Sequence, residues 1–250
     1  MNKTLMIVIL VAIISCKQNE ATKISAQQIV NRGIAVSGGE LYKTSDISFD
    51  FRGRKYIQER IGGKKILKRI LKNDTLDLVD VKTTHDFERY VDGKLAQIPD
   101  SLARAYANSV NSVHYFAYLP YGLNDPAVIK EYLDEVVIKD KKYHKIKVTF
   151  KQENGGDDFD DVYIYWFNTE SHKPDYLAYV FHDGDGGLRF RVAFNERNVN
   201  GIRFVDYKNF KPIKDNQSIY GIDNLYQKGE LELLSKIELE NITVSPGNYN

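Results

Sequence analysis

Cysteine and proline are scarce in this sequence: its 250 residues include one Cys and six Pro. One cysteine excludes a disulfide within the chain, and few prolines suit a fold built from hydrogen-bonded strands. The formal net charge of +1 gives no electrostatic case for nucleic-acid binding. Tyr (17) and Phe (12) are abundant by contrast, which favours a strand-rich fold with an aromatic core.

Motifs for catalysis and metal binding are missing as well. The sequence has no GxSxG, GxGxxG or GxxxxGK[ST] motif, and its five histidines form no HxH or HExxH spacing. Residues 182–187 (HDGDGG) and 157–161 carry carboxylates of the kind that bind calcium, but a glycine-rich turn and a solvated acidic loop explain them more simply. We therefore predict no catalytic residue, no metal site and no cofactor; a buried lysine that forms a Schiff base remains an open route to an enzyme.

The lone cysteine, Cys16, directly follows an apolar N-terminal segment. Residues 5–14 are apolar and follow Lys3, as in a secretory signal, and they are too few for a membrane span. Residues 13–16 (IISC) resemble a lipobox, the sequence at which bacterial lipoproteins are cleaved and acylated. The resemblance implies a signal peptide over residues 1–15 and lipid attachment at Cys16; the alternative is an uncleaved anchor helix with an incidental cysteine.

A lipid on Cys16 would determine where the protein lies. Residues 16–22 then form a polar tether between the membrane and the rest of the chain. Several acyl chains on one cysteine make a durable anchor, whereas one chain binds reversibly. Lys17 rather than Asp follows the cysteine, and by family resemblance this implies the outer membrane, with the folded part in the periplasm or at the cell surface.

Residues 160–212 contain four short runs of β-branched and aromatic residues separated by turn-forming clusters, the pattern of an antiparallel meander. Residues 162–167 and 176–181 are apolar on both faces, so both faces must be covered. Helices can cover one face, and the other can pack against a second layer or line a cavity. The third run, residues 188–194, places apolar side chains on one face and Arg189 and Arg191 on the other.

A cavity on this sheet would be a ligand site. Its predicted lining is Tyr163, Tyr165, Phe167, Tyr179 and Phe181, or the alternate side chains of the same strands. Arg189 and Arg191, with Arg203 on the next strand, could receive a carboxylate or phosphate head group. A solid core explains the aromatic side chains as well, and structural ion pairs with nearby acidic residues explain the arginines.

The rest of the chain is read in shorter elements. Helical spacing predicts helices over residues 24–36, 100–113 and 127–133. Alternating runs predict strands over residues 47–51, 55–61, 64–72, 75–83, 87–91, 136–138 and 143–152, and a closing pair over 229–240 and 242–244. His114, in an aromatic connection at 114–123, is expected to be buried and hydrogen-bonded. We find no internal repeat and no linker, and we predict one domain over residues 23–250.

The order of these elements resembles that of the lipoprotein carriers LolA and LolB, in which an N-terminal helix feeds a long antiparallel meander that a second helix interrupts. The segments YIYWFN, DYLAYVF, GLRFRVAFNER and IRFVDYKNFKP also resemble an uncharacterised family of predicted bacterial lipoproteins. The carrier resemblance implies a mainly β, α+β fold. One large, strongly curved antiparallel sheet would form an unclosed half-barrel, with two or three helices covering its concave side.

These features together predict a lipid-anchored envelope protein. Its half-barrel cavity would bind an apolar or amphipathic ligand such as a lipid, an acyl chain or a lipoprotein. The alternative is a non-enzymatic scaffold with a solid core that docks a partner in the envelope. An enzyme is a third reading, and it lacks a visible motif. The predicted partners are the membrane, through acylated Cys16, and the cavity ligand, with no nucleic acid.

Overall fold

The computed structural model of the chain describes residues 24–153, 161–182 and 186–247. In this part, fourteen strands form two antiparallel sheets, in the orders β14-β1-β2-β3-β4-β5-β6 and β13-β12-β11-β10-β9-β8-β7. The first sheet contains β1 (Ser45–Phe51), β2 (Arg54–Ile61), β3 (Lys64–Asn73), β4 (Leu76–Lys82), β5 (Phe87–Val91), β6 (Lys94–Leu95) and β14 (Glu240–Pro246). The second contains β7 (Val128–Ile138), β8 (Lys141–Phe150), β9 (Val162–Asn168), β10 (Pro174–Phe181), β11 (Gly187–Val199), β12 (Ile202–Pro212) and β13 (Leu231–Ile237).

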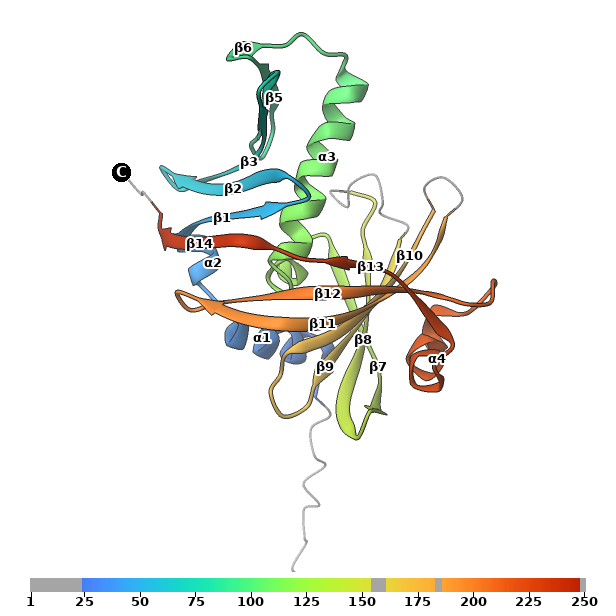
Figure 1. Cartoon of the computed structure of the whole chain (residues 1–250). Helices are drawn as coiled ribbons and strands as arrows, with labels where there is room; N and C mark the ends of the chain where they lie inside the picture. The colour runs from blue at the N-terminus through green and yellow to red at the C-terminus, as the bar shows by residue number, and fades with distance from the viewer. Residues whose placement is uncertain (1–23, 154–160, 183–185, 248–250) are drawn as a thin grey trace, which may run out of the picture.

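Four helices of the described residues pack against the two sheets. They are α1 (Ala26–Ser37), α2 (Leu41–Thr44), α3 (Asp100–Ala117) and α4 (Ile222–Lys228), with short 3-10 turns η1 (Tyr121–Asn124) and η2 (Ile219–Gly221). Helix α1 packs across β7, β9 and β12, while α3 packs against β3, β4 and β5 of the first sheet. Figure 1 shows α3 standing along the first sheet, and α4 on the far side of the second. The expected antiparallel, unclosed architecture with helices on its concave side is confirmed, but its strands form two sheets instead of one.

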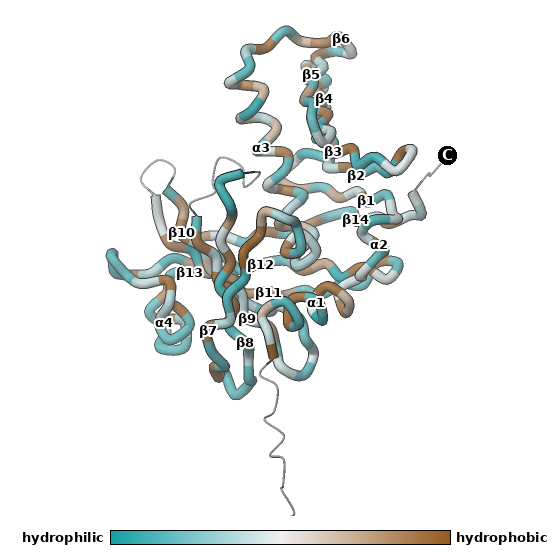
Figure 2. Tube along the Cα trace, turned by 180° about the vertical axis from the view of Figure 1, so that it is seen from behind, coloured by the Kyte–Doolittle hydropathy of each residue, from teal (hydrophilic) through white to brown (hydrophobic). Residues whose placement is uncertain are grey.

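Both faces of the central meander are buried, as its sequence predicts. One core combines both sheets with α1 and includes Phe49, Tyr165 and Phe204. A second core lies on the opposite face of β9–β11 beneath α4, where Trp166 and Phe190 are fully buried. Figure 2 shows hydrophobic residues concentrated in the central strands of the second sheet, and hydrophilic residues on the outlying hairpins. Successive side chains of these strands therefore point alternately into the first core and into the second.

The start of α1 follows directly from its sequence. Ser25 Oγ accepts a hydrogen bond from the backbone N–H of Gln28 at 3.2 Å, and the Gln28 side chain accepts one from the Ser25 N–H at 2.9 Å. This reciprocal pair satisfies two of the donors that a helix start leaves free. Gly38 ends the helix with φ 138°, in the region that favours glycine. The predicted N-terminal helix is confirmed.

Asp206 on β12 connects β11 to the segment where the chain passes from the second sheet to the first. Its carboxylate is buried and accepts hydrogen bonds from both Arg197 Nη atoms at 2.7 Å, from Asn195 Nδ2 at 2.6 Å and from the Leu239 N–H at 2.9 Å. Leu239 lies between β13 and β14, at the point where the chain passes from the second sheet to the first. These bonds fix that passage.

Two predicted elements are wrong. The predicted helix over residues 127–133 is instead the start of strand β7. This strand pairs with β8 along its whole length, from Val128 opposite Phe150 to Ile138 opposite Lys141. Asp125 and Pro126 resemble a helix start but precede a strand. The closing pair is also wrong: β13 pairs with β12, and β14 pairs with β1, so the two lie in different sheets.

Three helices also differ from prediction, and one of them, α2, is not predicted from the sequence. Helix α3 runs on through Ala117 and includes His114, which the sequence places in an irregular connection. Helix α4 was not predicted; it ends at Gly229, with φ 74° in the left-handed region. Across the described ranges, no helix has both the length and the apolar character that a membrane crossing requires.

Candidate ligand-binding site

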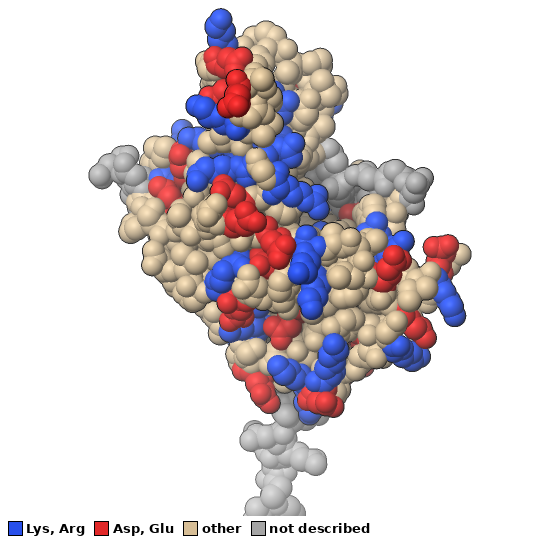
Figure 3. Space-filling model, in the orientation of Figure 1, with Lys and Arg blue, Asp and Glu red and all other residues tan. Residues whose placement is uncertain are grey.

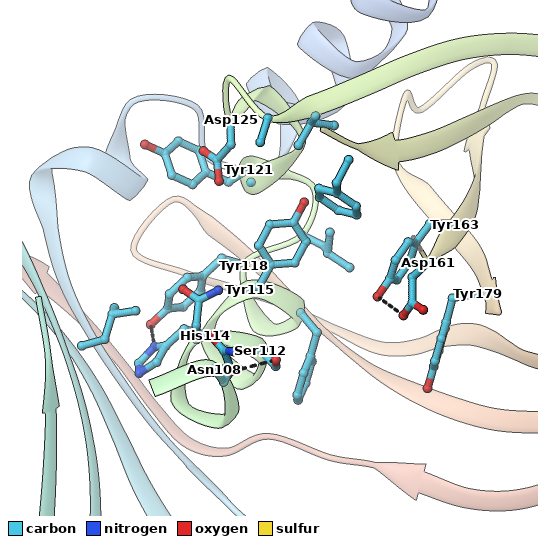
Figure 4. Close-up of a pocket in the computed structure, with 18 of the residues that line it drawn as sticks. Asn108, Ser112, His114, Tyr115, Tyr118, Tyr121, Asp125, Asp161, Tyr163 and Tyr179 are labelled. Atoms are coloured by element: carbon cyan, nitrogen blue, oxygen red, sulfur yellow. Dashed lines mark hydrogen bonds between the residues drawn. The ribbon is translucent and has the colours of Figure 1, made fainter. Parts of the chain in front are cut away.

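A cavity of ≈ 920 Å³ lies between the two sheets. Its walls come from β2–β4 of the first sheet, from the C-terminal half of α3 and the connection to β7, and from β8–β11 of the second sheet. Figure 4 shows Tyr115 at the end of α3, Tyr118 just after this helix, and Tyr163 and Tyr179 from the second sheet around this space. Small-molecule sites commonly measure about 300–1,000 Å³, so this intersheet cavity is large enough for a ligand.

Six of the seven side chains predicted to bind a ligand line this cavity: Tyr163, Tyr165, Tyr179, Phe181, Arg189 and Arg191. Strand register brings them together, because Tyr179 lies opposite Tyr163 on one side and opposite Arg189 on the other. The rings of Tyr163 and Tyr179 stack with their centroids 5.6 Å apart. The cavity face of the meander is therefore the one that carries the tyrosines and the arginines.

Phe167 shares this face but does not line the intersheet cavity. It is fully buried beneath α1, where Gly33 lies so close that an added Cβ would be 2.5 Å from Phe167 Cε1. Helix α1 thus fills the concave side at this end of β9. Only a residue without a side chain lets the helix approach so closely.

The two cavity arginines rest on aromatic rings. Arg191 donates from Nη2 to the Tyr179 hydroxyl at 2.9 Å, and its guanidinium carbon lies 4.9 Å from the centre of the same ring. Arg189 lies 4.9 Å over the Phe181 ring and donates to the Leu188 carbonyl at 3.0 Å. Such stacking holds a guanidinium in place while leaving other donors available.

Arg203 does not join this pair. Its Nε lies 2.7 Å from a carboxylate oxygen of Glu196. Arg197 forms a salt bridge with Asp206, also at 2.7 Å. Glu196 and Asp206, two of the acidic partners that the sequence offers for Arg189 and Arg191, are therefore engaged by other arginines. The third, the acidic loop over residues 154–161, lies mostly outside the described residues.

The rest of the cavity wall was not predicted. Its further aromatic and aliphatic members come from the end of α3, from η1 and from the connection between them: Tyr115, Phe116, Leu119 and Tyr121. Their only signal in the sequence is the aromatic density of residues 114–123. The first sheet adds Lys65 and Lys82. Burial and the neighbouring Lys65 charge lower the pKa of Lys82.

A family model decides the relationship. The family of unknown function (DUF6503) matches residues 70–239, which include α3 and every strand of the second sheet. The chain belongs to the DUF6503 family. The expectation of an uncharacterised family is thus confirmed, and no curated protein matches the sequence.

Solved structures resemble this DUF6503 protein at low sequence identity. A DUF1329 family protein from Desulfovibrio piger is 10% identical, with a TM-score of 0.50 over 88% of this chain and 92% of that chain. A LolA superfamily protein from Nitrosomonas europaea is 11% identical, with a TM-score of 0.48 over 88% of this chain and 93% of that chain. The first of these supports the fold, and neither specifies a ligand for the DUF6503 protein.

Acidic groups near the cavity form no metal site within the described ranges, where no three His, Cys, Asp or Glu residues are arranged to hold an ion. Asp161 lines the cavity and lies 3.3 Å from Nδ1 of His182 and 3.5 Å from the Tyr163 hydroxyl. The calcium-like carboxylates at 157–160 and 183–185 lie outside the described residues.

His114 is a buried, neutral member of the cavity wall. Its Nε2 lies 3.3 Å from the Lys68 carbonyl oxygen, which can only accept, so Nε2 carries the proton. Nδ1 then accepts from the Tyr118 hydroxyl at 3.0 Å. Burial lowers the pKa of His114 to about 3. The expectation of a buried, hydrogen-bonded histidine is confirmed.

Neutral His114 should make stability depend on pH. Its folded pKa of about 3 lies below the usual value of about 6.5, so between these values the unfolded chain binds the extra proton. Stability from this group is therefore complete above pH 6.5 and falls as the pH drops. At pH 5.5 we expect a loss of about 1.4 kcal/mol relative to pH 7.5. Urea unfolding of wild type and His114→Gln at both values checks this, and an equal pH dependence in the two proteins would contradict it.

Proposed function

We propose that this DUF6503 protein is a lipid-anchored envelope protein that binds an apolar or amphipathic ligand, a lipid or an acyl chain, in the intersheet cavity. The observation that carries the proposal is a ≈ 920 Å³ space between two sheets, whose lining combines aromatic and aliphatic side chains with polar and charged ones. Tyr163, Tyr165, Tyr179 and Phe181 form one wall of it, and Leu119 is on another. Each methylene that leaves water for such a site contributes about 0.8 kcal/mol.

The proposed cellular location is based on the N-terminal segment. Residues 1–16 combine a charged start, an apolar run and a lipobox-like end, which supports cleavage and acylation at Cys16. Cys16 lies outside the described residues. An acylated cysteine with a short tether would keep the cavity close to a membrane, where lipids are available. We place the protein at the outer membrane, with its folded part in the periplasm or at the cell surface.

Native mass spectrometry tests both parts of the proposal. The Cys16→Ser chain, which cannot be acylated, should emerge from bacterial cells with a lipid-sized adduct, while the unsubstituted chain should carry acyl mass on Cys16. The same Cys16→Ser protein should bind a fluorescent fatty acid in solution. Protein that is empty and that also fails to bind the fatty acid would refute the carrier function and favour the envelope scaffold.

A further inference from the structure

Four cationic side chains in the cavity wall form no salt bridge with a carboxylate of the described residues. Arg189 and Arg191 lie on the second sheet, and Lys65 and Lys82 lie on the first. Among the residues that the structure describes, no carboxylate oxygen lies within 4 Å of their nitrogens, whereas the nearby Arg203 is paired. Cations in a partly enclosed, low-dielectric site attract anions more strongly than cations in water do.

Arg191 is the most constrained of the four. Its guanidinium lies between the rings of Tyr179 and Phe116, at 4.9 and 5.7 Å from their centres. One donor is used by the Tyr179 hydroxyl, and the buried Nε has no hydrogen-bond partner within the described ranges. A buried donor without a partner is costly, and an anionic oxygen in the cavity would satisfy it.

The positive charge of the four cavity cations exceeds the negative charge of the described cavity wall. The described cavity wall contains Asp125 and Asp161 against the four cations. Asp161 is engaged by His182 and Tyr163. On the outer surface the charges are mixed instead: Figure 3 shows basic side chains over the β2–β3 hairpin with acidic side chains beside them. The excess of positive charge in the cavity is therefore not simply a property of the whole surface.

We infer that the cavity ligand is an anionic amphiphile whose carboxylate or phosphate head group lies at Arg189 and Arg191. Its chain extends deeper between the sheets, past the buried side chains of Leu177, Tyr165 and Leu119. This inference rests on the proposed function of the cavity and narrows its ligand class. Two neighbouring guanidinium groups can donate several hydrogen bonds to the oxygens of such a head group.

Matched ligands test the head group on the Cys16→Ser protein. Hexadecanoate and hexadecyl phosphate should displace a fluorescent fatty acid, and hexadecanol, which has the same chain without the charge, should bind at least about tenfold more weakly. Acetate and inorganic phosphate, which have the charge without the chain, should not compete at millimolar concentration. Competition by these small anions as strong as that by the long chains would overturn the inference in favour of a small-anion site.

Matched variants test the residues. The double change Arg189→Gln and Arg191→Gln should weaken hexadecanoate binding about 10- to 100-fold, the loss expected for charge-assisted hydrogen bonds, and should leave hexadecanol binding unchanged. The control is Arg54→Gln with Lys55→Gln, which removes the same charge from exposed positions on β2. Hexadecanol binding reports whether each variant is folded. If wild type binds hexadecanoate and hexadecanol equally tightly, or if the control variant loses as much hexadecanoate affinity as the double variant, the head-group site is overturned and the proposed function stands. If no long-chain ligand binds at all, the proposed function is overturned as well.

Discussion

Replacing Asp80 with Asn should lower the free energy of unfolding by about 3–5 kcal/mol, the range for breaking a buried ion pair. Asp80 is fully buried on β4, and its carboxylate binds two arginines. Arg69 donates from Nε and Nη2 at 2.8 and 2.6 Å, and Arg89 donates from Nε and Nη2 at 2.6 and 3.0 Å. An amide would leave both guanidinium groups, whose side chains are only 9% and 13% exposed, without a counter-charge.

The same cluster attaches α3 to the first sheet. Arg69 Nη1 donates to Ser109 Oγ at 2.8 Å, and the Arg89 guanidinium lies 3.5 Å over the ring of Tyr106. Both partners belong to α3, whose C-terminal half forms part of the cavity wall. Losing the carboxylate should therefore loosen the helix as well as the sheet.

Chemical denaturation with urea measures the Asp80 effect. Asp77→Asn on the same strand is the matched control: its side chain is 40% exposed and lies 3.4 Å from Lys72. Exposed pairs of this kind contribute about 0–1 kcal/mol. A loss at Asp80 no larger than that at Asp77 would mean that the two arginines find other partners or water once the charge is gone.

Period-2 alternation made the cavity residues predictable. Side chains two positions apart on a strand share a face in any fold, and short turns fix which residues of neighbouring strands lie opposite one another. Tyr163, Tyr165, Tyr179 and Phe181 therefore had to lie together on one face. Phe167 lies on the same face but does not line the cavity, because α1 covers it. The alternation of a strand cannot predict where a helix packs along it.

Long-range partners were not predictable for the same reason. Strand β14 pairs with β1, with Val244 opposite Ile47, across almost the whole chain. Nothing local distinguishes that pairing from a hairpin with β13. The helix predicted at 127–133 failed through a local ambiguity, since a Pro after an Asp begins a helix or precedes a strand depending on what the next residues can pair with. The cavity needs both sheets, so its far wall was beyond the reach of sequence patterns.

Filling the cavity is the direct test of where the ligand lies. Ala127 lines the cavity just before β7 and is 8% exposed. A tryptophan there would project into the space between the sheets and exclude part of the chain of a bound amphiphile. Loss of only two buried methylenes amounts to about 1.6 kcal/mol, so Ala127→Trp should weaken hexadecanoate binding by more than about tenfold, and Ala127→Leu by less.

The matched control is Ala105→Trp, which adds the same side chain on the exposed side of α3. It should leave hexadecanoate binding unchanged, because position 105 does not line the cavity. Thermal unfolding shows whether each variant keeps its fold, and a graded loss from Leu to Trp at position 127 separates occlusion from general damage. If Ala127→Trp folds and binds hexadecanoate as tightly as wild type, the ligand lies elsewhere, and both the tyrosine wall and the two arginines lose their assigned role.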